Sequence, residues 1–357
     1  MMHVGIIGCG AIALRRHVPE YLDNAACRLA GFFDASPGRA AETAAQFGGR
    51  AYGSLADMLA DPAVDAVSVC TSNRFHAPVS IAALQAGKHV LCEKPIAVTN
   101  DEAQAMIDAA DKAGCVLMVG HNQRLVDAHR KARECVDAGL IGRVIGFRTT
   151  FRHGGPEGWS RDGGAGTWFF RAGDASMGVL GDLGIHKVDL VRWLLRDEVA
   201  TVFCRTATLD KRNEHGQPIE VEDNAQCLIR MRNGVQGMMD LSWTHYGQEE
   251  NGTVLFGTRG VMRICDKDAQ PLVIERPDEM PLVVEAEGIS TNARQHRSGV
   301  IDRFVRAVLH GEKPEADGAE GAAALRVVLA CLESGRTGLE VLLMEYVRGA
   351  APNASPD

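Results

Sequence analysis

Apolar residues follow two rhythms along this chain. Over about the first 120 residues, short apolar runs alternate with segments in which apolar residues recur every three or four positions. The runs are typical of strands buried on both faces, and the segments between them are typical of the helices that cover such strands. This alternation predicts βαβ units around a parallel sheet. The expected strands are 3–7, 28–33, 63–70, 89–95 and 115–122, and the expected helices are 14–23, 37–47, 54–62, 76–87 and 99–113.

Beyond residue 122 the pattern changes. Longer strand-like runs follow one another, with turn signals such as Asn233-Gly234 between them. This predicts a second domain of the α+β class over residues 123–345, with one mostly antiparallel, open sheet, and a disordered tail over 346–357. The expected strands are 143–152, 199–209, 223–232, 235–245, 252–257, 261–265 and 272–275, and the expected helices are 126–138, 182–195, 297–310 and 318–334.

Composition narrows the class of ligand and the compartment. The 357 residues carry a net charge of −8, which argues against a nucleic acid or an anionic membrane as partner, since either needs a basic face. No apolar run is long enough to span a membrane. The cysteines are scattered through apolar runs without a C-x-x-C pair, which predicts reduced thiols, metal-independent chemistry and a cytoplasmic location. A small diffusible ligand is therefore expected.

A glycine motif directly follows the first expected strand. Gly8 to Ala13 matches G-x-G-x-x-G/A, in which the first glycine permits a tight turn and the second lets a pyrophosphate approach the backbone. Asp34 ends the second expected strand, where a Rossmann fold carries its ribose-binding carboxylate. We therefore expect residues 1–122 to form an α/β Rossmann domain that binds a dinucleotide; the alternative is a purely structural turn. The expected contacts in this part of the chain are Gly8, Gly10, Ala11, Ile12 and Asp34.

Asp34 also bears on which dinucleotide binds. A carboxylate accepts hydrogen bonds from the ribose hydroxyls and repels a 2′-phosphate, which favours NAD over NADP. Arg39, further along the chain, partly offsets this repulsion, so NADP stays an alternative.

Two polar segments lie at the carboxyl ends of expected strands, where open α/β sheets bind ligands. They are Thr71 to His76 and Glu93 to Pro95. The first also suits a helix cap, since Ser72 or Asn73 precedes the helix that begins at His76. The second also suits a solvated loop. Spacing alone leaves a ligand site and these structural roles equally open.

A third group of residues falls at the start of the expected helix 182–195. Asp182 and His186 are four residues apart and share one face of a helix, so the carboxylate fixes the tautomer of the imidazole and raises its basicity. A dehydrogenase needs such a base to take the hydroxyl proton of its substrate. The alternative is a core histidine, because His186 also continues an apolar stripe formed by Leu183, Leu190 and Leu194.

Taken together and in this order, these motifs resemble those of the glucose–fructose oxidoreductase, inositol dehydrogenase and rhizopine catabolism (Gfo/Idh/MocA) family, from residue 3 to about 345. The family's T-P-N-x-x-H stretch is Thr71 to His76, with serine in place of proline, and its A-G-K-H-V-x-x-E-K-P stretch is complete as Ala86 to Pro95. Its D-x-G-x-H-x-x-D helix is Asp182 to Asp189. Two departures concern the substrate pocket: Met177-Gly178-Val179 replaces a glycine run, and residues 153–176 form an enlarged Gly- and Trp-rich insertion.

The resemblance implies a division of roles. Lys94 is expected between nicotinamide and substrate, where it hydrogen-bonds the reacting oxygen. His186 is expected to act as general base in oxidation and as general acid in reduction, and Asp182 to orient it or to bind a neighbouring hydroxyl. The ribose and nicotinamide end of the cofactor is expected to contact the two loops at the sheet edge, namely Thr71, Asn73, Glu93 and Lys94, with His76 in support.

Members of the family commonly act on sugars, inositols and related polyols, so the resemblance implies NAD(P)-dependent hydride transfer with such a substrate. The substrate pocket is expected to include residues that follow the domain junction or lie in the insertion: Arg124, Arg152, His153 and Trp159. Trp159 equally suits a lid or an interface, and the open sheet suits assembly into a homodimer or homotetramer. Two alternatives share the fold, an NAD-dependent glycoside hydrolase with transient redox steps and a non-catalytic dinucleotide-binding regulator. The presence of both Lys94 and His186 disfavours the regulator.

Overall fold

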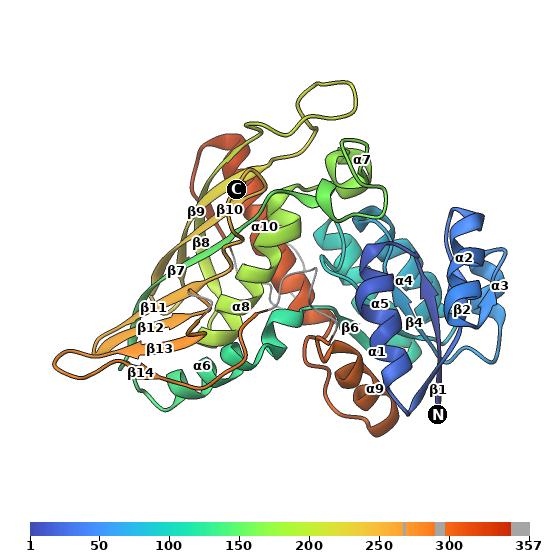
Figure 1. Cartoon of the computed structure of the whole chain (residues 1–357), viewed down its shortest axis with the longest axis horizontal. Helices are drawn as coiled ribbons and strands as arrows, with labels where there is room; N and C mark the ends of the chain where they lie inside the picture. Colours follow the sequence, from blue (N-terminus) through green and yellow to red (C-terminus); the bar gives the residue numbers. More distant parts are fainter. Residues whose placement is uncertain (267–268, 290–296, 344–357) are drawn as a thin grey trace, which may run out of the picture.

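The computed structural model describes residues 1–266, 269–289 and 297–343, and within them the chain forms two layered domains that pack side by side (Figure 1). The expected fold class is confirmed for both: a parallel sheet with helices on both faces, and a mostly antiparallel sheet with helices on one face. The expected tail 346–357 lies outside the described residues.

The N-terminal domain is built on a six-stranded parallel sheet in the order β3-β2-β1-β4-β5-β6. The order reverses between β1 and β4, so the carboxyl ends of these strands flank the crevice in which such a sheet binds its ligand. The edge strand β3 has only two residues, too few for an apolar pattern, and the sequence did not predict it. The strands are β1 (Met2–Ile7), β2 (Cys27–Phe33), β3 (Arg50–Ala51), β4 (Ala66–Val69), β5 (His89–Cys92) and β6 (Leu117–Val119).

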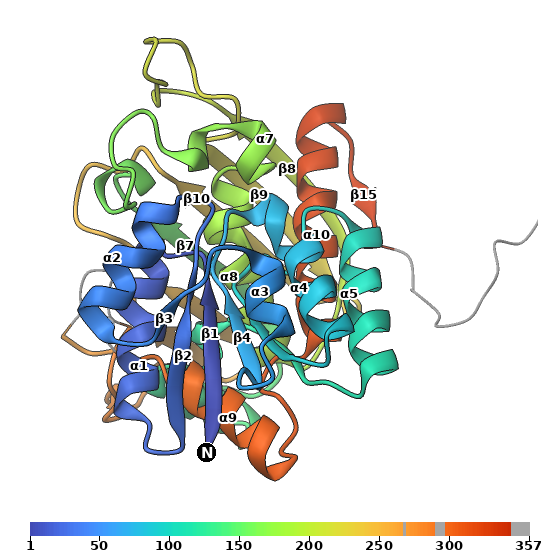
Figure 2. The same ribbon diagram turned by 90° about the vertical axis from the view of Figure 1, so that its right-hand side faces the viewer.

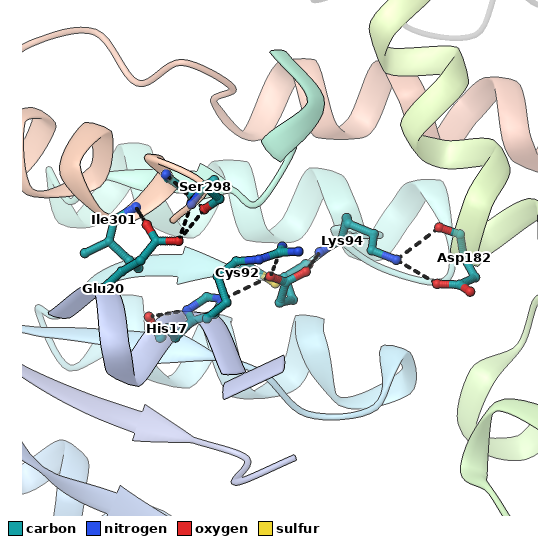
Figure 3. Close-up of polar contacts among 11 residues, drawn as sticks. His17, Glu20, Cys92, Lys94, Asp182, Ser298 and Ile301 are labelled. Carbon is teal, nitrogen blue, oxygen red and sulfur yellow. Dashed lines mark hydrogen bonds and ion pairs between the residues drawn. The ribbon is translucent and has the colours of Figure 1, made fainter. Parts of the chain in front are cut away.

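Helices cover both faces of this sheet (Figure 2). One face carries α1 (Val18–Asp23), α2 (Pro37–Phe47) and α9 (Val300–His310), and the other carries α3 (Leu55–Ala60), α4 (His76–Gln85) and α5 (Asn100–Ala113). The helix α9 returns from near the end of the described chain. Glu20 accepts hydrogen bonds from the backbone N–H and the hydroxyl of Ser298, just before α9 begins (Figure 3). This late helix packs in the N-terminal core, although the sequence assigned its residues to the second domain. The division of the chain at residue 122 stays a prediction.

The second domain is built on a nine-stranded sheet in the order β14-β13-β12-β11-β7-β10-β9-β8-β15. Among the described strands of this second sheet, only the pair β7–β10 is parallel. The short edge strands β14 and β15 were not predicted, for the same reason as β3. The strands are β7 (Val144–Arg152), β8 (Val199–Ala207), β9 (Asn224–Met231), β10 (Gln236–Ser242), β11 (Thr253–Gly257), β12 (Gly260–Ile264), β13 (Leu272–Glu275), β14 (Leu282–Val283) and β15 (Val341–Leu342).

Helices cover the face of this sheet that is turned toward the N-terminal domain, and the opposite face is open (Figure 1). They are α6 (Asp127–Asp137), α8 (Ile185–Leu195) and α10 (Gly318–Thr337), while the short α7 (Ala172–Ala175) lies in the insertion. The long α10 packs against β8 and α8 and also against α5, so it joins the two domains. No helix in the described parts of the chain is long and apolar enough to cross a membrane.

Two helices near the sheet edge begin with a π-helical turn. Residues 13–17 form such a turn before α1, and residues 180–184 form one before α8. A π-helical turn is wider than an α-helical turn, because its backbone hydrogen bonds join residues five positions apart rather than four. The sequence predicted regular helices over 14–23 and 182–195 and did not predict these two turns.

Candidate active site

A cavity of about 470 Å³ lies at the carboxyl end of the parallel sheet and is lined by both domains. Its walls contain most of the residues that the sequence assigned to a site. They come from the glycine turn, the end of β2, the two loops after β4 and β5, the insertion 153–176, and the start of the helix that carries His186. These residues are Gly8, Gly10, Ala11, Ile12, Asp34, Thr71, Asn73, His76, Glu93, Lys94, Trp159, Asp182 and His186.

The glycine turn leaves room for a phosphate. Gly8 has a φ of +90°, and a Cβ at this position would lie 2.6 Å from the carbonyl oxygen of Cys70, so a side chain is excluded. A Cβ on Gly10 would instead enter open space, with the same carbonyl oxygen 4.0 Å away as its nearest neighbour. The space in front of Gly10 and the backbone amides that follow it fit the pyrophosphate of a dinucleotide.

Asp34 lies beside this turn at the end of β2. One carboxylate oxygen accepts a hydrogen bond from the backbone N–H of Cys9 at 2.7 Å, and the other accepts one from Ser36 at 2.8 Å. Each oxygen keeps a lone pair for a ribose hydroxyl. Arg39 also lines the cavity, but it forms an ion pair with Asp162, which leaves its charge less free for a 2′-phosphate. This arrangement favours NAD.

Glu93 is a buried anion in the cavity wall. Its Oε1 accepts a hydrogen bond from Nε2 of His17 at 2.9 Å and lies 3.8 Å from Nη1 of Arg16. Burial by itself raises the pKa of Glu93, but the hydrogen bond and charge of His17, with the charges of Arg16 and Lys94, bring it down to about 2. Arg16 and His17 are both buried in the π-helical turn 13–17. The sequence did not predict their contact with Glu93, because a local pattern does not show which distant side chain a residue meets.

Lys94 spans the space between the two domains. Its Nζ donates hydrogen bonds to Oδ1 of Asp182 at 2.8 Å and to the backbone oxygen of Asp182 at 3.0 Å (Figure 3). Trp243 donates from Nε1 to the other carboxylate oxygen at 3.2 Å. The side chains of Lys94 and Asp182 are 15% and 6% exposed, so the pair is shielded from water and its attraction is strong. An ammonium group has three N–H donors, which leaves one for a ligand in the cavity.

His186 is half-buried at the cavity wall as a neutral imidazole. Burial, followed by the nearby charge of Lys94, holds its pKa well below the ordinary range. Among the described residues, Asp182 gives its oxygens to Lys94 and Trp243 and none to His186, so the expected hydrogen bond between Asp182 and His186 does not form. The carboxylate is instead held by Lys94 of the other domain and by the indole N–H of Trp243, and Nδ1 of His186 has no hydrogen-bond partner among the described residues.

The loop after β4 is tied to its surroundings by polar contacts. The ring nitrogens of His76 lie 2.6 Å from the carbonyl oxygen of Pro95 and 3.1 Å from that of Thr71, so His76 links the two loops at the sheet edge. Burial lowers the pKa of His76. Asn73 donates a hydrogen bond to the carbonyl oxygen of Ala175 at 2.9 Å and thereby holds the insertion of the second domain.

The insertion 153–176 also reaches the glycine turn. Arg161 donates to the carbonyl oxygen of Cys9 at 2.5 Å and pairs with Glu42 at 2.8 Å, beside the pair of Arg39 and Asp162. Figure 1 shows α7 and its flanking loop facing the N-terminal domain near α4. The insertion therefore covers part of the cofactor end of the cavity. The sequence did not predict these contacts, because no local pattern states where a long loop folds.

Comparison with known proteins identifies the family. Residues 2–121 match the oxidoreductase family model with an NAD-binding Rossmann fold, and residues 129–263 match the Gfo/Idh/MocA C-terminal domain. The chain belongs to the Gfo/Idh/MocA oxidoreductase family. Its N-terminal domain is accordingly an NAD-binding Rossmann domain.

Relatives with a named activity include dehydrogenases and a reductase. Levoglucosan dehydrogenase of Pseudarthrobacter phenanthrenivorans is 31% identical over 246 residues, which are 64% of this chain and 62% of that protein, less than two thirds of its length. Myo-inositol 2-dehydrogenase of Thermotoga maritima is 29% identical over 352 residues, which are 97% of this chain and 100% of that protein. A solved structure of levoglucosan dehydrogenase with NADH and levoglucosan superposes with a TM-score of 0.82 at 26% identity, over 96% of this chain and 99% of that one.

Three residues that the sequence assigned to the substrate pocket do not line the cavity. They are Arg124, Arg152 and His153. Arg124 is buried and donates two hydrogen bonds to Asp189, at 2.8 and 2.6 Å, which ties it to α8. Arg152 forms an ion pair with Asp240 on the neighbouring strand β10. His153 is buried and accepts a hydrogen bond from the backbone N–H of Gly155. Each side chain is committed to an internal partner, so of the four expected residues only Trp159 lines the cavity.

One group of side chains in the described part of the chain suits a metal ion. The sulfur atoms of Cys204, Cys227 and Cys331 lie within 4.8 Å of one another, and all three residues are buried. They belong to β8, β9 and α10 and do not line the cavity. All ten cysteines are free thiols in the structure.

Proposed function

We propose that the protein is an NAD-dependent dehydrogenase that transfers a hydride between the nicotinamide and a CH–OH group of a sugar, an inositol or a related polyol. One observation carries this proposal: Lys94 of the first domain and Asp182 and His186 of the second line the same cavity as the glycine turn. The activities named for the relatives support the choice of substrate class. NADP is the weaker fit, because Arg39 is already paired.

Bound dinucleotide supplies the acceptor or donor of the hydride. In the proposed mechanism, Lys94 gives its remaining N–H to the reacting oxygen and stabilises the negative charge that grows there during oxidation. Asp182 positions Lys94 through two hydrogen bonds and is itself held by Trp243. His186 accepts the hydroxyl proton in oxidation and returns it in reduction. Its low pKa keeps the imidazole neutral, and so able to accept a proton, at neutral pH.

The activity is tested by incubating the protein with NAD and a panel of cyclitols, hexoses, glycosides and sugar acids while NADH absorbance is recorded. We expect net NADH formation with at least one neutral member of the panel. Release of an aglycone from a glycoside without accumulation of NADH supports the glycoside hydrolase of the same fold instead. A protein that binds NADH and produces neither result contradicts both enzymatic functions.

We also infer that the protein is a cytoplasmic homodimer or homotetramer, assembled from copies of this chain through the open face of the second sheet. Exposed apolar side chains gather there: Leu228 and Met238 are directly opposed on β9 and β10, and Phe256 lies on β11. Exposed apolar residues grouped on one face are typical of a protein interface. Light scattering of Met238→Glu should give a monomer where the unmodified protein gives an oligomer, and an unchanged mass would contradict this assembly.

A further inference from the structure

Four aromatic residues line one part of the cavity, and we refer to them as the aromatic wall: Phe151, Trp159, Trp168 and Phe169. Within it, the rings of Trp168 and Phe169 are stacked with centroids 3.9 Å apart, and Trp159 meets Phe169 edge-on at 5.1 Å. Three of the four, Trp159, Trp168 and Phe169, belong to the insertion 153–176. The insertion thus contributes a broad aromatic surface to the cavity.

The aromatic wall is continuous with the proposed catalytic groups. Phe169 packs against Trp243 at 6.4 Å, and Trp243 donates the hydrogen bond to Asp182. At the other side, the ring of Phe151 lies 6.1 Å from that of His186. A ligand whose hydroxyl reaches Lys94 and His186 therefore extends along the wall.

The charged side chains around the cavity are largely neutralised within the protein. Five of the six cationic ones form ion pairs: Arg16 with Glu93, Arg39 with Asp162, Lys94 with Asp182, Arg161 with Glu42 and Arg171 with Asp174. Arg15, the sixth, lies in the π-helical turn that follows the glycine motif, at the cofactor end. The substrate end therefore offers no unpaired cation, among the described residues, to a carboxylate or phosphate on the substrate.

We infer that, if the proposed function holds, the substrate is an uncharged glycoside with an apolar aglycone. The C–H groups on one face of a pyranose ring pack well on aromatic side chains, and an apolar aglycone extends this contact. Most of this wall has no hydrogen-bonding group, so a polar substituent packed against it would lose its water, which costs binding energy. Trp159 adds specificity, because its Nε1 has no hydrogen-bond partner among the described residues and suits a glycosidic or ring oxygen.

Matched ligands test this inference directly. Calorimetry measures the affinity of the enzyme–NADH complex for matched glycosides. The ligands are methyl and phenyl glycosides of glucose, galactose and xylose, and the phenyl glycuronides that correspond to glucose and galactose. We expect the phenyl glycoside to bind about 10-fold more tightly than its methyl partner, since burial of an aromatic ring is worth at least this factor. The phenyl glycuronide, which differs from the phenyl glucoside or galactoside by one carboxylate, should bind more weakly than either.

Two variants assign the effect to the wall. Trp168→Ala should reduce the phenyl-to-methyl ratio to about 2-fold or less while the affinity for NADH stays the same, because the stacked surface is gone. Trp193→Phe is the control: Trp193 lies on α8, outside the cavity lining, and should leave the ratio unchanged. A ratio near one in the unmodified protein, tighter binding of the glycuronide, or an unchanged ratio in Trp168→Ala overturns the inference.

The outcomes separate this inference from the proposed function. Tight, Trp168-dependent binding of phenyl glycosides without NADH formation from any sugar refutes the hydride transfer and leaves the substrate surface intact. NADH formation from inositols or sugar acids alone, without a preference for phenyl glycosides, supports the proposed hydride transfer. It refutes the inference that the substrate is a glycoside.

Discussion

Lys187 offers a quantitative test of the environment around the helix that carries His186. Its side chain is 0% exposed, and its Nζ has no hydrogen-bond partner among the described residues. The nearest ring, that of Phe151, is 5.7 Å from Nζ. Burial lowers the pKa of Lys187 from the usual 10.5 to about 7.

The sign and size of the effect follow from proton linkage. Because the folded-state pKa is depressed, the unfolded chain binds more protons than the folded one between about pH 7 and pH 10.5, and stability rises with pH across this window. Below about pH 7, keeping Lys187 buried costs about 5 kcal/mol of unfolding free energy, since the pKa falls from 10.5 to about 7 and each pKa unit corresponds to about 1.4 kcal/mol. Above the unfolded pKa this cost disappears.

The substitution Lys187→Met removes the charge and keeps the length of the side chain. Urea unfolding at about pH 6 should show the variant more stable than the unmodified protein by about 3 kcal/mol or more, and the gain should shrink toward about pH 10. The control is Lys88→Met, because Nζ of Lys88 donates to the carbonyl oxygens of Asp61 and Val64. It should destabilise the protein, since two buried acceptors lose their donor. A Lys187→Met variant that is less stable at pH 6, or whose gain does not depend on pH, refutes this reasoning.

Three further predictions concern the site. Gly10→Val should keep the thermal unfolding midpoint while NADH affinity falls about 10-fold or more, because the new side chain enters only the phosphate space; equal NADH affinity in fluorescence titration would remove Gly10 from the cofactor site. Glu222 caps the π-helical turn before α8 through two backbone N–H groups, and burial raises its pKa to about 7, so its stabilising contribution is lost as pH rises through 7. Glu222→Gln should therefore be more stable than the unmodified protein above about pH 8 in urea unfolding, and a lower stability there would contradict the assignment. Arg161→Ala removes the contact with Cys9 and should speed NADH release in stopped-flow displacement; an unchanged rate would show that the insertion does not retain the cofactor.

The fold was predictable where local patterns repeat. Each buried strand of the parallel sheet longer than two residues appears in the sequence as an apolar run, and Asn233-Gly234 marked the hairpin between β9 and β10. The strands β3, β14 and β15 were missed because two residues carry no period. The return of α9 to the N-terminal core was also missed, because a helical pattern states which face is apolar and not which sheet covers it.

The site was predictable where a motif fixes the backbone. The glycine turn, the loop that carries Lys94, and the helix start that carries Asp182 and His186 all reach one cavity. Side-chain partners were not predictable: Asp182 binds Lys94 of the other domain and Trp243 in place of His186, and helix spacing does not reveal such distant partners. Arg124 shows the same limit, since its residue type suits a polar pocket while its partner, Asp189, becomes visible only in the structure.

The account depends most on Lys94 acting at the reacting oxygen. The decisive measurement compares Lys94→Met with the unmodified protein in two assays on the same preparation: NADH formation from the best sugar of the panel, and NADH affinity by fluorescence. The account predicts that turnover falls about 100-fold or more while the NADH dissociation constant changes less than about 3-fold, because Lys94 supplies charge stabilisation to the transition state and little to cofactor binding. A variant that retains most of its turnover would contradict it.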